Sequence, residues 1–161
     1  MTMKKLIIMF LVAMMISGCG SAAKEVSNTP TNNNNNVQTG ISMNQNKSIQ
    51  IQIGSKCFNA TLENNPTVEA FIKKLPLDVE LEELNGNEKF YRFNDGFPTS
   101  DTKPDIIRTG DLMLYGGSYF VVFYKDFATS YSYTRLGKIE DVEGLVEALG
   151  ENNIRVKIIS E

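Results

Sequence analysis

The chain has 161 residues, with 16 basic and 19 acidic side chains, no histidine and no tryptophan. The resulting formal charge of −3 argues against nucleic acid as a partner. The lack of histidine excludes imidazole metal ligands, histidine-based catalytic dyads and serine triads in their usual forms. We therefore expect no metal site and no cofactor.

Residues 1–18 have the pattern of a cleaved leader. Lys4 and Lys5 precede an apolar run over residues 6–16, which is shorter than the roughly 20 residues needed to cross a bilayer. The run and the small residues before Cys19 resemble a bacterial lipoprotein signal, which implies a thioether-linked lipid on Cys19 and an extracytoplasmic, membrane-anchored protein. Cleavage would leave 14 basic and 19 acidic residues, a formal charge of −5.

Residues 19–47 are rich in Asn, Thr, Ser and Gln and contain few large apolar side chains. Such a composition cannot bury enough apolar surface to offset the entropy of ordering, so it predicts a flexible tether. The folded domain is then residues 48–161, a length that suits one core. Because the lipid takes Cys19, Cys57 has no intramolecular disulfide partner, and its strand-like surroundings predict a packed thiol.

The domain begins with alternating apolar and polar residues, which predict two strands. Ile49, Ile51 and Ile53 alternate with glutamines, and after a turn at Gly54 the alternation resumes over residues 58–62. Asn65 followed by proline predicts a helix start, and the helix is expected to end before Pro76.

A second hairpin is predicted around the Asn85-Gly86 turn, with its return strand over residues 89–93. Residues 94–109 are predicted to form a long loop, and loops of this length are commonly functional. Two further apolar strands, residues 112–115 and 118–124, flank Gly116-Gly117 and are expected to lie in the core.

A hydroxyl-rich loop follows, and it carries the first candidate binding residues. Tyr131, Tyr133 and Arg135 alternate along the chain, so they share one face if the segment is extended. Aromatic rings and a forked cation suit a peptide carboxylate, a carbonyl or a flat ring. The alternative is that these side chains satisfy backbone carbonyls within the loop.

The remaining elements complete the predicted fold. Asp141 is expected to cap a second helix with Val142, Leu145, Val146 and Leu149 on one face and Gly150 at its end, and residues 154–158 form a closing strand. About seven or eight strands and two short helices, with no βαβ alternation, predict a mainly β fold: a closed antiparallel barrel with two helices capping its ends.

Four segments lie between residues 58 and 149: FNATLENNPTVEAFIKKLP, RTGDLMLY, FVVFYKDFATSYSYTRLGKI and DVEGLVEAL. On these segments, residues 57–158 resemble the bacterial cyclophilin-like fold family. The resemblance implies an eight-stranded closed barrel with two capping helices, in agreement with the count above.

A second likeness is to the prolyl isomerases after which that fold is named. The segment FYRFNDGF follows the cyclophilin spacing Phe-His-Arg-x-x-x-Gly-Phe, which implies Arg92 as the catalytic arginine and Phe97 as a pocket aromatic. A guanidinium that donates to the prolyl nitrogen would stabilise the twisted amide. The chain departs from the pattern in lacking the pocket tryptophan and histidine, and Arg108 stands about where a glutamine is expected.

Three functions are compatible with these features. The preferred one is a lipid-anchored module that binds a peptide or small ligand without catalysis, at a barrel mouth formed by Arg92, Arg108 and residues 131–135, with Asn64 as a further polar candidate. The alternatives are a prolyl isomerase for secreted proteins and an accessory subunit that docks a redox or transport partner. The sequence gives no indication of oligomeric state.

Overall fold

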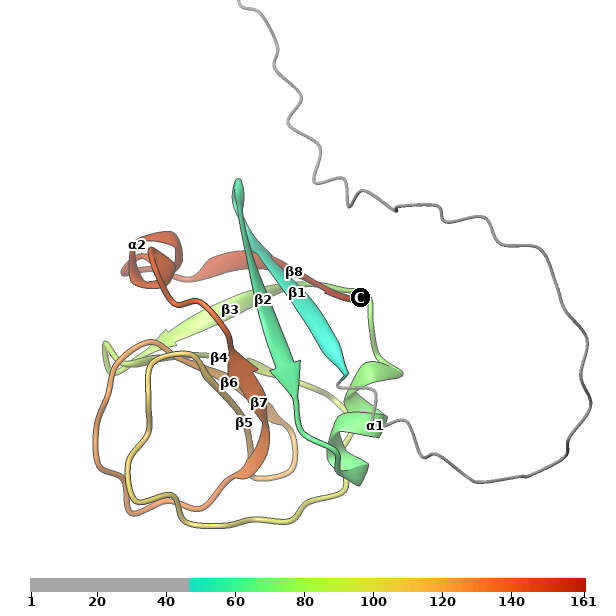
Figure 1. Cartoon of the computed structure of the whole chain (residues 1–161). Coiled ribbons are helices and arrows are strands. Elements are labelled where there is room, and N and C mark those ends of the chain that lie inside the picture. Colours follow the sequence, from blue (N-terminus) through green and yellow to red (C-terminus); the bar gives the residue numbers. More distant parts are fainter. Residues whose placement is uncertain (1–46) are drawn as a thin grey trace, which may run out of the picture. The chain divides into compact units, whose positions relative to one another are not determined.

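The computed structural model describes residues 47–161, which form a closed eight-stranded antiparallel barrel with two helices (Figure 1). The order around the barrel is β1-β2-β7-β5-β6-β4-β3-β8. No helix in this range is both long and apolar enough to span a membrane. In chain order the elements are β1 (Ser48–Ile53), β2 (Lys56–Leu62), α1 (Pro66–Ile72), β3 (Leu77–Leu84), β4 (Glu88–Arg92), β5 (Asp111–Tyr115), β6 (Tyr119–Phe123), β7 (Thr134–Ile139), α2 (Leu145–Leu149) and β8 (Ile154–Ser160).

The predicted fold class is confirmed, and the core that the sequence pattern indicates fills the barrel. Alternate residues of each strand point inward, so Ile49, Ile51 and Ile53 of β1 are buried while Gln52 is exposed. The rings of Phe71 in α1 and Phe120 in β6 stack at 5.2 Å between centroids. The barrel interior is therefore filled by packed apolar side chains.

The first helix begins as predicted, but the second does not. Asn65 Oδ1 accepts a hydrogen bond from the Val68 amide at 2.9 Å, which is the expected N-cap contact. Asp141 instead accepts from the Glu143 amide within a turn, and α2 begins later, after Gly144. The five-residue α2 buries Leu145 and Leu149, whereas Val146 within it and Val142 before it are exposed.

A second apolar cluster lies outside the barrel, on the outer faces of β5 and β6. Met113, Val121, Phe123, Ile107 and Tyr133 form it. Two long segments, residues 93–110 and 124–133, run beside each other over this region (Figure 1) and are joined by the bridges Thr102–Tyr133 and Ile107–Phe127. These loops explain why β5 and β6 are apolar on both faces.

One expectation about packing is wrong. Cys57 lies in β2, as its strand pattern indicates, but its side chain is exposed. Inward positions on β2 are taken by Phe58, Ala60 and Leu62, and alternation places Cys57 on the opposite face.

Candidate functional site

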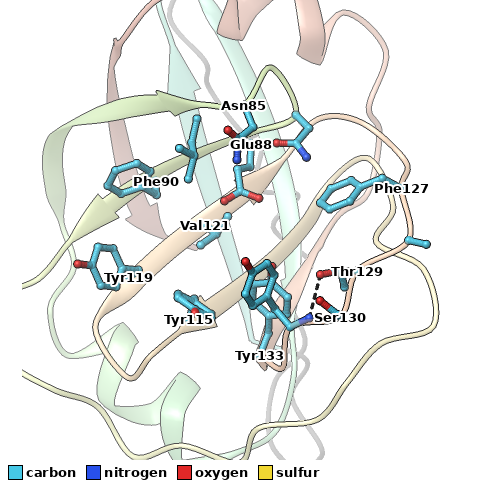
Figure 2. Close-up of a pocket in the computed structure, with 14 residues that line it drawn as sticks. Asn85, Glu88, Phe90, Tyr115, Tyr119, Val121, Phe127, Thr129, Ser130 and Tyr133 are labelled. Carbon is cyan, nitrogen blue, oxygen red and sulfur yellow. Dashed lines mark hydrogen bonds between the residues drawn. The ribbon is translucent and has the colours of Figure 1, made fainter.

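An aromatic pocket of about 460 Å³ opens on the outer wall of the barrel (Figure 2). Strands β4, β5 and β6 form its floor, and the segment between β6 and β7 forms one side. The lining residues are Leu84, Asn85, Asn87, Glu88, Phe90, Tyr115, Tyr119, Val121, Phe127, Ala128, Thr129, Ser130, Tyr131 and Tyr133. We refer to this set as the aromatic pocket.

The strand register explains how the floor is assembled. Phe90 of β4 pairs with Val121 of β6, and Tyr115 of β5 pairs with Tyr119 of β6. Glu88 lies two residues before Phe90, so both side chains leave β4 on its outer face. Three adjacent strands therefore supply side chains to one surface patch.

Contacts between the rings fix the walls of the aromatic pocket. Tyr115 is central, with its ring centroid 5.5 Å from that of Tyr133, 5.8 Å from that of Tyr131 and 6.4 Å from that of Tyr119. Phe90 and Tyr119 are 5.8 Å apart. Tyr131 is 58% exposed and Tyr133 is buried, so Tyr131 forms the rim and Tyr133 the base. A pocket whose walls support each other in this way needs little ordering when a ligand enters.

Glu88 is the acidic group of this pocket, and it lacks a compensating charge. Figure 2 shows its carboxylate directed into the space between Phe90, Phe127 and Tyr115. Within residues 47–161 its side chain has no hydrogen bond or ion pair. Burial raises the pKa of the Glu88 carboxyl, and the nearby charge of Glu83 raises it further.

Burial also raises the pKa of the Tyr133 hydroxyl, and the charge of Glu88 adds to that rise. A second polar group is unsatisfied nearby: Asn87, which also lines the aromatic pocket, has its Oδ1 atom buried without a hydrogen-bond partner. The pocket thus combines aromatic walls with acceptors that have no partner in the described protein.

Asp126 ties the two covering loops together beside the pocket. Its carboxylate accepts hydrogen bonds from Arg108 Nη1 at 2.8 Å, from the Thr109 amide at 2.8 Å and from Thr109 Oγ1 at 3.0 Å. The hydrogen bond from Arg108, with those from Thr109, lowers the pKa of Asp126 to about 2. The adjacent Phe127 is thereby held against Phe123, with 5.7 Å between the ring centroids.

The structure brings together two of the predicted ligand-binding residues, Tyr131 and Tyr133, in the aromatic pocket. Arg135, in β7, pairs instead with the buried Asp111, with Nη1 3.3 Å from Oδ1. Arg108 is engaged by Asp126. Neither arginine lines the pocket: the Arg108 ion pair joins the two covering loops, and the Arg135 ion pair joins β7 to β5.

The other predicted site residues lie elsewhere. Arg92 is exposed at the end of β4, with its guanidinium carbon 5.6 Å from the centroid of the Tyr119 ring, so it lies next to the pocket without lining it. Phe97 is buried in the barrel core against Phe93, because it anchors the long loop there. Asn64 is exposed before α1 and does not line the pocket. The expected barrel mouth is therefore not where these residues meet.

Sequence reasoning missed most of the pocket, including Glu88, Phe90, Tyr115, Tyr119 and Phe127. A signal was available in β5 and β6, which are apolar on both faces. In a single closed barrel one strand face points outward, so a strand that is apolar on both faces requires a second cover. Nothing in the sequence, however, indicates which loop supplies that cover.

Residues 51–159 match the family profile described as the cyclophilin-like family. The chain belongs to the cyclophilin-like family. Among solved structures, a hypothetical protein from Archaeoglobus fulgidus, determined in solution, is 15% identical, with a TM-score of 0.54 over 71% of this chain and 94% of that one. At this identity the likeness extends to the fold of the cyclophilin-like domain alone. No curated protein matches the chain.

Two further predicted features of this family member concern metal and lipid. Within residues 47–161, no group of three or more Cys, Asp or Glu side chains is placed to hold a metal ion. Cys19, the predicted lipidation site, lies outside the described residues, as do the leader and almost all of the tether.

Proposed function

We propose that this protein is a membrane-anchored, extracytoplasmic binding module whose cyclophilin-like barrel presents the aromatic pocket to a small ligand or a peptide side chain. The observation that supports this proposal is the pocket itself, which has a volume of about 460 Å³ and is lined by six aromatic rings and a few polar side chains, among them Glu88 and Asn87. Concave, mostly apolar surfaces with a few polar groups are the usual form of ligand sites.

The binding proposal is tested by filling the pocket. Ala128 lines it and is exposed, so Ala128→Phe adds a ring there without removing core packing. We expect amide signals of Phe90, Tyr115 and Phe127 to shift together when NMR is used to screen water-soluble fragments and short peptides. The same compounds should no longer bind Ala128→Phe, while Ser55→Phe, in the exposed β1–β2 turn, retains binding. Shifts scattered over other faces would contradict the proposal.

The membrane anchor rests on the leader sequence. A single-cysteine cleavage motif followed by an Asn-rich segment suits a lipid attached to Cys19 and a tether between it and the domain. Labelling with radioactive palmitate in a bacterial host tests this directly. We expect the label to be lost in Cys19→Ala and retained in Cys57→Ala; unchanged labelling of Cys19→Ala contradicts lipidation.

Prolyl isomerase activity is the second candidate, and Arg92 is the observation that favours it. The guanidinium has no acidic partner within residues 47–161 and lies beside an aromatic pocket. Phe97, however, is committed to the barrel core, so the apolar cup that would hold a proline ring has to come from other residues. A protease-coupled isomerisation assay distinguishes the two: activity that is lost in Arg92→Ala establishes an enzyme, and no activity in either protein leaves the binding module.

The third candidate, an accessory subunit, requires a broad exposed apolar patch outside the pocket. Leu84, Tyr115 and Tyr131 are exposed large apolar side chains, but they belong to the pocket. The others among residues 47–161 are Ile106 in the long loop, Val142 before α2, Val146 in α2 and Ile159 in β8. The exposed apolar side chains therefore favour the binding module.

A further inference from the structure

We propose that the aromatic pocket selects an alkylammonium group, either of a free amine or of a lysine side chain, and that the Glu88 carboxylate recognises its positive charge. This inference rests on the proposed function, because it assigns a ligand class to the same pocket. It derives from the position of one unpaired carboxylate among aromatic rings.

The ring arrangement is suited to a cation. Phe90, Tyr115, Tyr119 and Phe127 surround the space from three strands and a loop (Figure 2). Tyr131 adds a further ring to the lining. Aromatic faces carry negative electrostatic potential, so a cation among several of them is attracted while its alkyl chain is buried. The protein itself already uses this contact at the edge of the pocket, where the Arg92 guanidinium lies over the Tyr119 ring.

Glu88 provides the charge that the aromatic walls alone lack. A carboxylate that is partly removed from water is costly unless an opposite charge accompanies it. The neighbouring Lys89 does not supply that charge, because it leaves β4 on the opposite face and binds Glu83 at 2.7 Å. Lys125, near Gly86 in the β3–β4 turn, forms no ion pair with Glu88. A ligand cation would offset the cost of partly burying the Glu88 carboxylate.

The acceptors also favour a cation that donates hydrogen bonds over a quaternary one. The Glu88 carboxylate accepts hydrogen bonds only, and Asn87 adds a buried amide oxygen without a partner. A primary ammonium group offers three donors, whereas a quaternary group offers none. Anionic ligands are disfavoured because the pocket lining contains one acidic residue and no basic one.

The test measures charge selectivity in the full chain, solubilised in a nonionic detergent. Four of the six tyrosines line the pocket and the chain has no tryptophan, so tyrosine emission reports occupancy. The probes are Nα-acetyl-lysine methylamide and its neutral counterpart Nα-acetyl-norleucine methylamide. We expect the lysine compound to bind about tenfold more tightly at pH 7.5. Glu88→Gln, which keeps the side-chain shape, should reduce this preference to about twofold or less, and Glu147→Gln on α2 should keep it.

The outcomes separate this inference from the proposed function. If the norleucine compound binds as tightly as the lysine compound, the pocket does not discriminate ligands by charge and the inference is wrong. If Glu88→Gln keeps the preference for the lysine compound, Glu88 is not the residue that recognises the charge and the inference is also wrong. If neither probe binds any of the three proteins, the inference is wrong, and the binding function is then decided separately by the fragment and peptide screen with Ala128→Phe. Butylammonium, which lacks the amide groups, identifies the source: binding equal to that of the lysine compound indicates a free amine, and weaker binding indicates a peptide.

Discussion

Lys89 Nζ lies 2.7 Å from Glu83 Oε2, and none of the Lys89 side chain is exposed. The same oxygen accepts a hydrogen bond from the Tyr124 hydroxyl at 2.7 Å, and Lys89 also donates to the Asn152 carbonyl at 2.8 Å. Partial burial opposes ionisation of Glu83, but the hydrogen bonds from Lys89 and Tyr124 outweigh it and lower its pKa. The ammonium group of Lys89 can be buried because Glu83 supplies a counter-charge and the Asn152 carbonyl supplies a second acceptor.

Removing this lysine is expected to destabilise the barrel. Lys89→Met keeps most of the side-chain volume but leaves Glu83 without its counter-charge. Because Glu83 remains partly exposed, we expect a loss of about 2–3 kcal/mol in the free energy of unfolding, below the usual cost of breaking a fully buried pair. Urea denaturation followed by circular dichroism measures it. Arg155→Met breaks the exposed pair with Asp78 and should cost less than about 1 kcal/mol; equal losses would show that burial of Lys89 contributes nothing.

Glu88 is expected to lower the stability of the ligand-free protein at neutral pH. Its pKa is raised in the folded state, so the folded protein binds a proton more readily than the unfolded chain between the ordinary value of 4.5 and the raised one. Stability from this group therefore falls as the pH rises through that window. We expect Glu88→Gln to be more stable than the natural protein at pH 7, and the difference to shrink near pH 4.

Urea titrations of both proteins at the two pH values measure this effect. A Glu88→Gln protein that is less stable at pH 7 would mean that Glu88 has a stabilising partner. The expected gain in stability, combined with the expected loss of ammonium selectivity, would identify Glu88 as a residue kept for binding at the expense of folding.

The sequence predicted the barrel better than the site, for a physical reason. Alternation in β1 and the Asn65 N-cap depend on neighbours within a few residues, so local patterns reveal them. The aromatic pocket depends on register between strands that are distant in sequence, such as the pairing of Phe90 with Val121. Tyr131 and Tyr133 were found because they stand out in one polar loop, whereas Glu88 lies in a strand where a charge is unremarkable.

The roles assigned to arginines show the same limit. Arg108 and Arg135 have the chemistry of ligand-binding residues. The sequence cannot reveal that Arg108 forms an ion pair with Asp126 and that Arg135 forms one with Asp111. Phe97 follows an isomerase-like spacing, yet its loop turns the ring toward Phe93 in the core. In each case a partner brought by the tertiary fold decides the role.

The contacts of Asp126 predict a carboxyl group with an unusually low pKa. We expect carbon-13 NMR to give a pKa of about 2 for Asp126, and Arg108→Met combined with Thr109→Val to return it toward 3.8. Because the folded pKa is depressed, the stabilisation is present above pH 3.8 and is lost as the pH falls toward 2. Lys74→Met should raise the pKa of Asp95 and leave Asp126 unchanged. An Asp126 pKa that stays near 2 in the double variant would mean that the Arg108 and Thr109 side chains do not lower it, because only the Thr109 backbone amide remains.

Gly137 in β7 lies directly against the backbone of β2, and this contact predicts a strong requirement for glycine. A methyl group at this position would meet the Thr61 carbonyl oxygen and lie 2.9 Å from Leu62 Cα. Both atoms belong to the backbone of β2, so no side-chain rotation relieves the overlap, and the strands must separate where Leu62 pairs with Gly137. We expect Gly137→Ala to cost about 2–3 kcal/mol in the free energy of unfolding, as overpacking in a core does.

Gly96→Ala is the matched control, because its added methyl would come no nearer than 3.9 Å to another atom, the Gly117 carbonyl oxygen. Its φ also lies outside the left-handed region, so the substitution should leave stability nearly unchanged or raise it slightly by restricting the unfolded chain. Thermal unfolding of the two variants compares them. Equal midpoints of thermal unfolding would mean that β2 and β7 lie further apart in solution, with room for a methyl group where Leu62 pairs with Gly137.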